Sequence, residues 1–149
     1  MTSVTAATGA DGDSWAAMRQ ALWPDTAPDE HRAEIAAQLN RPHDTINLIV
    51  RLADGTPAGF AEASIRHDHV NGCNTSPVGF VEGIYVAPQY RRMGLARQLL
   101  ASIETWVRQR GCSELASDAL QDNTISQQMH HALGFAETSR VVYFRKALD

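Results

Sequence analysis

The chain has 149 residues, of which 44% are hydrophobic and 20% are charged, so it is long and apolar enough to bury a core as one domain spanning residues 1–149. Its 13 Lys and Arg against 17 Asp and Glu leave a net charge of −4. This balance argues against broad nucleic-acid binding and favours a cationic or neutral partner.

The two cysteines, Cys73 and Cys112, lack metal-ligand spacing and predict reduced thiols. Residues 1–10 have neither the basic nor the apolar region of a signal peptide. No apolar run is long enough to cross a bilayer. We therefore expect a cytoplasmic protein that has no membrane contact.

Periodicity and turn signals predict strands and helices that alternate along the chain. The expected strands are 4–8, 45–52, 57–65, 78–86, 113–117 and 140–147. The expected helices are 15–22, a second one beginning at Pro28, 94–110 and 123–133. The order β-α-α-β-β-β-α-β-α-β predicts an α/β (α+β) fold, in which a mixed central sheet has helices on both faces.

The most informative segment joins the end of the 78–86 strand to the 94–110 helix. Its residues are Arg91, Arg92, Met93, Gly94, Leu95 and Ala96. The free N–H groups and the dipole at a helix start bind anions, and Gly94 lets a phosphate come close because it has no Cβ. The two arginines add positive charge. The alternative is an ordinary strand-turn-helix with surface arginines.

Two motifs resemble the GNAT acetyltransferase superfamily. Arg91-x-x-Gly94-x-Ala96 is similar to its Arg/Gln-x-x-Gly-x-Gly/Ala signature, and Asn123-x-x-Ser126-x-x-x-His130-x-x-x-Gly134-Phe135 is similar to its Asn-x-x-Ala-x-x-x-Tyr-x-x-x-Gly-Phe segment. The resemblance implies a GNAT fold over nearly the whole chain and acetyl-CoA as cosubstrate, with no metal. We expect cofactor contacts from Ile84, Tyr85, Val86, Arg91, Arg92, Met93, Gly94, Leu95, Ala96, Asn123 and Ser126.

Three residues are candidates for catalysis. Glu82 lies in an apolar strand, so it either forms a buried salt bridge or faces the site of the acetyl acceptor, which we favour. Asp118 is a second acidic candidate or a cap, and two carboxylates there would attract a protonated amine and accept its proton. His130 stands where the family has a tyrosine that protonates the CoA thiolate; it either takes that role, leaves it to water, or is a surface histidine.

No Ser-His-Asp or Cys-His constellation is evident, so we expect direct attack of the amine in a ternary complex. The backbone N–H groups of residues 84–86 are the expected oxyanion donors.

Four stretches, 15–24, 30–31, 65–73 and 76–86, resemble the chromosomal-type aminoglycoside 6′-N-acetyltransferases. This resemblance implies acetylation of the 6′-amine of a polycationic aminoglycoside, antibiotic resistance and a homodimer. The residues that it places on the acceptor side are Trp23, His69, Glu82, Asp118 and Glu137. The alternative for Trp23 is a place in the hydrophobic core. The alternative for Glu137 is a solvated position at the start of a strand. His67, Asp68 and His69 have the residue types of a metal site, but we expect them to belong to a flexible polar loop.

Other functions remain open. A GNAT enzyme with this cofactor site could acetylate a polyamine or another small amine. A non-catalytic sensor would bind acetyl-CoA without turnover, and a structural protein would keep only the fold.

Overall fold

A computed structural model describes all residues, 1–149, and they form two compact units, Met1–Ser117 and Asp118–Asp149. The elements of the first unit are β1 (Ser3–Ala6), η1 (Gly9–Asp11), α1 (Gly12–Leu22), α2 (Pro28–Leu39), β2 (Thr45–Arg51), β3 (Pro57–Arg66), β4 (Val78–Val86), η2 (Pro88–Tyr90), α3 (Leu95–Gln109) and β5 (Leu115–Ala116). The second unit contains α4 (Thr124–Ala132). No helix combines the length and the apolar character that crossing a bilayer requires.

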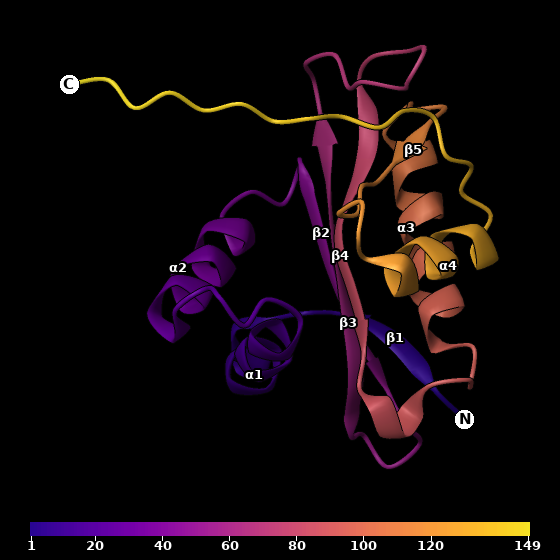
Figure 1. Cartoon of the computed structure of the whole chain (residues 1–149). Helices are drawn as coiled ribbons and strands as arrows, with labels where there is room; N and C mark the ends of the chain where they lie inside the picture. The colour runs from indigo at the N-terminus through magenta and orange to yellow at the C-terminus, as the bar shows by residue number, and fades with distance from the viewer. The chain divides into compact units, whose positions relative to one another are not determined.

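The first unit is built on a five-stranded sheet of order β1-β2-β3-β4-β5. The first three pairings are antiparallel and the β4–β5 pairing is parallel. Helices α1 and α2 cover one face of this sheet and α3 covers the other (Figure 1). The predicted mixed sheet with helices on both faces is therefore confirmed.

The face of the sheet under α3 is closely packed. Leu99 and Ile103 of α3 are fully buried, and Val107 lies directly over Gly79 of β4. A Cβ on Gly79 would come within 2.5 Å of Val107 Cγ2, so only glycine lets the helix approach this closely. Each buried aliphatic side chain stabilises the unit by roughly 1.5–3 kcal/mol.

The C-terminal part of the chain differs from the sequence prediction. Residues 135–149 have no regular secondary structure, although 140–147 was expected to form a strand, and β5 is limited to two residues. A strand needs a neighbour for its N–H and C=O groups, and the second unit offers none. Val142 and Phe144 are 74% and 92% exposed.

The loop between β3 and β4 is anchored at one carboxylate. Glu114, just before β5, accepts hydrogen bonds from the backbone N–H groups of Asn74 and Thr75, at 2.9 and 2.7 Å, and from the Thr75 hydroxyl. The Thr75 hydroxyl, together with the two amides, lowers the pKa of the Glu114 carboxyl. Glu114 therefore holds a loop that contains the candidate acceptor residue His69.

This anchor predicts a pH dependence of stability. Because the pKa of Glu114 is lowered on folding, its contribution is full above the ordinary value of 4.5 and is lost as the pH falls through the lowered value. Glu114→Gln should lower the melting temperature at pH 7. It should have little effect at a pH below the lowered pKa of Glu114, where the carboxyl is protonated. Thermal unfolding of both proteins at a series of pH values checks this, and a pH-independent difference would contradict it.

Candidate functional site

An extra residue interrupts the pairing of β3 with β4. Glu62 pairs with Gly83 and Ala63 pairs with Val81, so Glu82 has no partner of its own. Such a β-bulge bends the strand and redirects its side chains. Glu82 contacts Ser64 and Arg66 of β3, which places its carboxylate on the face of the sheet that α1 and α2 cover.

The bulge is also where β4 parts from β5. The parallel ladder ends at the pair Phe80–Ala116, and the Ser117 hydroxyl then donates to the carbonyl of Val81 at 3.3 Å. Directly after β4, the Ala87 N–H donates to the carbonyl of Ala58 in β3 at 2.9 Å.

Amide directions alternate along a strand. Since the Ala87 N–H points to β3, the amides of Ile84 and Val86 point to the opposite, open edge of β4. Tyr85 points its amide to β3, and its ring packs against Phe60 with centroids 6.1 Å apart. Of the three residues expected to offer backbone donors, the geometry therefore leaves Ile84 and Val86 with available N–H groups.

The loop after β4 has the features of an anion site. Arg92 and Gly94 have positive φ angles of 65° and 75°, and residues 91–94 are exposed while Leu95 is buried. A Cβ on Gly94 would meet nothing within 4 Å, so packing does not explain this glycine. Glycine suits this position because its backbone is left-handed. The open space beside the α3 N-terminus suits a phosphate group.

The two arginines of this loop have different environments. Arg91 donates from Nε to the carbonyl of Val86 at 2.9 Å, so it ties the loop back to the open edge of β4. The exposed Arg92 side chain has its charge available to an anionic ligand. Met93 is 52% exposed, and Ala96 lies in the first turn of α3.

Glu82 is paired with an arginine, but the pair is not buried. Arg66 Nη2 lies 3.0 Å from each Glu82 oxygen, and the Ser64 hydroxyl donates to Oε1 at 2.7 Å. The Glu82 and Arg66 side chains are 35% and 43% exposed, and the guanidinium lies 3.5 Å from the ring centroid of Phe80. The expected alternative of a buried salt bridge is therefore wrong in one respect: Glu82 forms a salt bridge to an arginine, but the pair is open to solvent.

Sequence reasoning missed Arg66 and Ser64 as partners of Glu82. The signal was available, because residues 62, 64 and 66 of a strand lie on one face. What the sequence did not reveal is the bulge, which turns Glu82 to that same face.

Trp23 packs against the residue that follows Glu82. It ends α1, is half-buried, and covers Gly83, where a Cβ would come within 2.5 Å of its Cζ2 atom. Its ring also meets Phe60 edge-on, with centroids 6.0 Å apart. Trp23 is thus both a core residue and a flat surface next to Glu82.

In the second unit, Asn123 caps α4. Its Oδ1 accepts from the Ser126 N–H at 3.1 Å, as the side chain of an N-cap residue does. His130 Nδ1 lies 2.7 Å from the carbonyl of Ser126, and its ring packs edge-on against Phe135. A carbonyl only accepts, so Nδ1 holds a proton in this hydrogen bond.

The remaining candidates are on the surface. Asp118 and His69 are exposed. Glu137 binds Arg140, and this hydrogen bond lowers the pKa of its carboxyl. His67 Nε2 lies 3.1 Å from Asp44, and no group of three or more His, Cys, Asp or Glu side chains is arranged to hold a metal ion.

The cysteines do not form a disulfide. Burial raises the pKa of both thiols, and the charge of Glu114 raises that of Cys73 further. Both thiols therefore stay protonated at neutral pH and are poor nucleophiles.

Comparison with known sequences gives one family. The model of the acetyltransferase (GNAT) family matches residues 14–135. A relative from Serratia marcescens, named aminoglycoside N(6′)-acetyltransferase type 1, is 52% identical over 136 residues, which are 91% of this chain and 92% of the relative. One of the same name from Stenotrophomonas maltophilia is 45% identical over 147 residues, 99% of this chain and 94% of the relative.

Solved structures agree. The aminoglycoside antibiotic 6′-N-acetyltransferase AAC(6′)-Ih from Acinetobacter baumannii superposes with a TM-score of 0.95 at 42% identity and covers 100% of both chains. AAC(6′)-Iy, solved in complex with the bisubstrate analog CoA-S-monomethyl-acetylneamine, has a TM-score of 0.92 at 43% identity and covers 99% of both chains. The expected GNAT fold is confirmed.

The open space at Gly94 gives a prediction with a matched control. Gly94→Ala should raise the KM for acetyl-CoA by about tenfold, equivalent to ~1.4 kcal/mol, because the methyl group occupies space that the phosphates need. Gly111→Ala is the control, since Gly111 has a φ of 79° and equally nothing within 4 Å. Steady-state kinetics of both variants check this. If Gly94→Ala and Gly111→Ala change the KM equally, backbone strain alone explains the effect and the prediction is wrong.

Proposed function

The chain belongs to the GNAT acetyltransferase family, and on that premise we propose that it transfers the acetyl group of acetyl-CoA to the 6′-amine of aminoglycoside antibiotics and so confers resistance. The observation that supports this acceptor most directly is the partly exposed carboxylate of Glu82, whose neighbour in the chain, Gly83, is covered by the Trp23 ring. A negative charge next to a flat apolar surface suits an amino sugar. The relatives of 45–52% identity bear the name of this activity.

The first unit provides the cofactor contacts of this proposal. The loop 91–96 and the N-terminus of α3 hold the pyrophosphate, with Arg92 as the exposed cation and Arg91 fixing the loop. Ile84 and Val86 donate their free N–H groups to the cofactor. Tyr85, which lies between them, is a third contact and uses its side chain. Bound there, acetyl-CoA supplies an activated acetyl thioester. Oriented amides in this position stabilise charge that develops on the thioester oxygen.

Glu82 attracts the ammonium form of the acceptor, which competes with Arg66 for the carboxylate. An exposed ion pair is worth only about 0–1 kcal/mol, so an aminoglycoside with several charges can displace the arginine. Glu82 then accepts the proton of the amine, directly or through water, because only the neutral amine is a nucleophile. Asp118, His69 and Glu137 are further acceptor contacts in this proposal, with Glu137 released from Arg140.

His130 protonates the departing CoA thiolate, with its ring oriented by the hydrogen bond from Nδ1 to the Ser126 carbonyl. Water is the alternative donor. In the second unit Asn123 and Ser126 contact the cofactor as well as forming the cap of α4. The protonated thiols of Cys73 and Cys112 support direct transfer without an acyl-enzyme.

The whole chain, 1–149, acts as a single acetyltransferase domain, since the family model runs from residue 14 to residue 135. Two unpaired thiols fit a reducing, cytoplasmic location. A net charge of −4 suits a polycation and not a nucleic acid.

A thiol-release assay with a kanamycin-like drug and with spermidine tests the acceptor. We expect turnover with the drug, and turnover with spermidine alone would move the activity to polyamines. Acetyl-CoA binding without turnover on any amine would favour the sensor.

In the same assay, Glu82→Gln should lower kcat/KM for the drug by about tenfold to a hundredfold, because a hydrogen bond to a charged group is worth about 1.5–3 kcal/mol. The KM for acetyl-CoA should stay unchanged. Glu104→Gln, which removes another partly exposed carboxylate, is the control and should behave as the unmodified protein. A Glu82→Gln variant that keeps its activity would contradict the assigned role.

We also infer a homodimer in which a second copy covers the C-terminal apolar run. Val141, Val142, Tyr143 and Phe144 are strand-forming residues in extended chain, and all four are exposed. A contiguous apolar run on the surface indicates an interface, and hydrogen bonds to a second chain would satisfy its backbone.

Val142→Asp combined with Phe144→Asp should therefore give a monomer, because the dimer would have to bury two charges in this run. Light scattering after size-exclusion chromatography measures the mass. Asp149→Asn, at the chain end, serves as the control. A dimer of unchanged stability in the double variant would refute this interface.

A further inference from the structure

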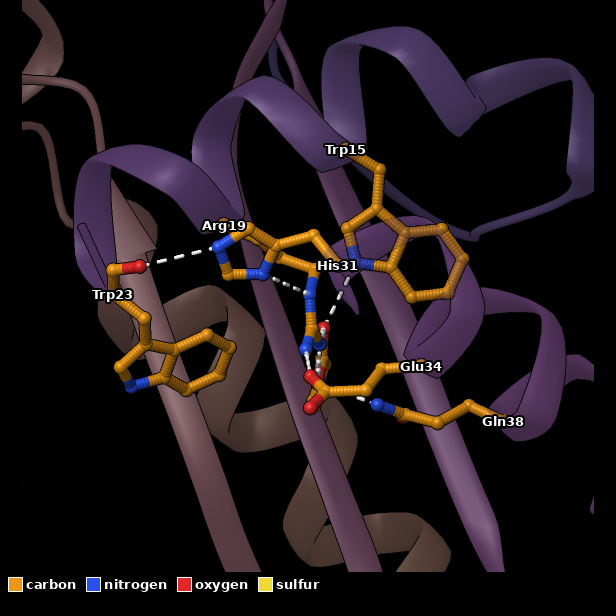
Figure 2. A network of polar contacts seen from close by, with 7 residues as sticks. Trp15, Arg19, Trp23, His31, Glu34 and Gln38 are labelled. Carbon is orange, nitrogen blue, oxygen red and sulfur yellow. Dashed lines mark hydrogen bonds and ion pairs between the residues drawn. The ribbon is translucent and has the colours of Figure 1, made fainter. Parts of the chain in front are cut away.

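A buried polar network lies between α1, α2 and β3. Arg19 of α1, Glu62 of β3 and His31 of α2 are 2%, 1% and 0% exposed. The Arg19 guanidinium binds both oxygens of Glu62 and one oxygen of Glu34. Figure 2 shows the side chains of His31 and Glu34 lying around the Arg19 guanidinium. None of them has a role in the proposed chemistry.

The carboxylate of Glu62 is fully satisfied. Besides Arg19, the Trp15 indole N–H donates to Oε2 at 2.9 Å, and the Gln38 amide donates to Oε1 at 2.7 Å. A buried pair with all its hydrogen bonds made has one preferred arrangement. The network therefore gives its members fixed positions.

The hydrogen bonds also fix the state of His31. Arg19 Nε donates to His31 Nδ1 at 3.2 Å, and a guanidinium can only donate, so Nδ1 is an acceptor. The proton of the neutral ring is then on Nε2, which lies 3.1 Å from the backbone carbonyl of Trp23. His31 thus transmits the position of the buried arginine to the residue that ends α1.

The same network reaches the ring of Trp23. The Arg19 guanidinium carbon lies 4.8 Å from the Trp23 ring centroid. The His31 and Trp23 rings are stacked, with their centroids 6.5 Å apart. In Figure 2 the indole of Trp23 lies beside the His31 ring, and a dashed line joins the backbone of Trp23 to it. On its other side the indole covers Gly83, next to Glu82.

We propose that Arg19 and His31 are positioning residues that hold Trp23 against Gly83 and thereby set the affinity for the acetyl acceptor. This inference rests on the proposed function, because Trp23 is the acceptor wall only in that proposal. A purely structural network would affect stability alone, whereas a positioning network also sets the KM for the acceptor without changing that for acetyl-CoA.

Two conservative variants of His31 separate these roles. His31→Gln can place its amide nitrogen near the position of Nε2 and keep the bond to Trp23, whereas His31→Asn is too short to reach that carbonyl. We expect His31→Asn to raise the acceptor KM by about fivefold to tenfold, as loss of one buried hydrogen bond implies, and His31→Gln to stay within about twofold. Neither should alter the KM for acetyl-CoA.

Gln38→Met is the control for stability, because it removes a donor to Glu62 without touching Trp23. It should lower the melting temperature and leave the acceptor KM unchanged. In a Trp23→Ala background, His31→Asn should have no further effect on the acceptor KM, since residues that act through one another are not additive.

If His31→Asn does not fold, Arg19→Lys gives the same test. Lysine keeps a charge for Glu62 but has no Nε–H for His31. Equal acceptor KM values for the Asn and Gln variants would overturn the inference, as would an effect of Gln38→Met as large as that of His31→Asn. Absence of acceptor turnover by the unmodified protein would instead refute the proposed function.

Discussion

The site depends on the one extra residue in β4. With Glu82 inserted opposite Glu62, the strand changes the direction of its amides at the point where the β5 ladder ends. This leaves Ile84 and Val86 with free N–H groups on one edge and turns a carboxylate to the face covered by α1 and α2. Without the bulge, the free amides and the carboxylate would lie at different positions along the strand.

The two faces of the sheet fix this strand by different means. Under α3 the packing is apolar and close, down to the absence of a Cβ at Gly79. Under α1 and α2 a buried ion pair holds the core. Removing one partner of such a pair costs about 3–5 kcal/mol, while an apolar replacement of both is often neutral. In the role proposed for this network, the ion pair also fixes the position of Trp23.

Much of the fold could be predicted from the sequence because it follows from local patterns. The apolar run of β4, the stripe of α3 and the loop at Gly94 each appear in adjacent residues. The Arg19–Glu62 pair joins residues far apart in the chain, so no local pattern reveals it. The strand expected at 140–147 could not be judged from propensity, because a strand also needs a neighbour. Glu82 stood out, but its partner Arg66 depended on a bulge that the sequence does not mark.

The most direct test is amide hydrogen exchange of β4 measured by NMR with and without CoA. If the cofactor binds along the open edge, the amides of Ile84 and Val86 should gain protection, while that of Tyr85, already directed at β3, should not change. No change at Ile84 and Val86 under conditions that saturate the protein with CoA would contradict the account.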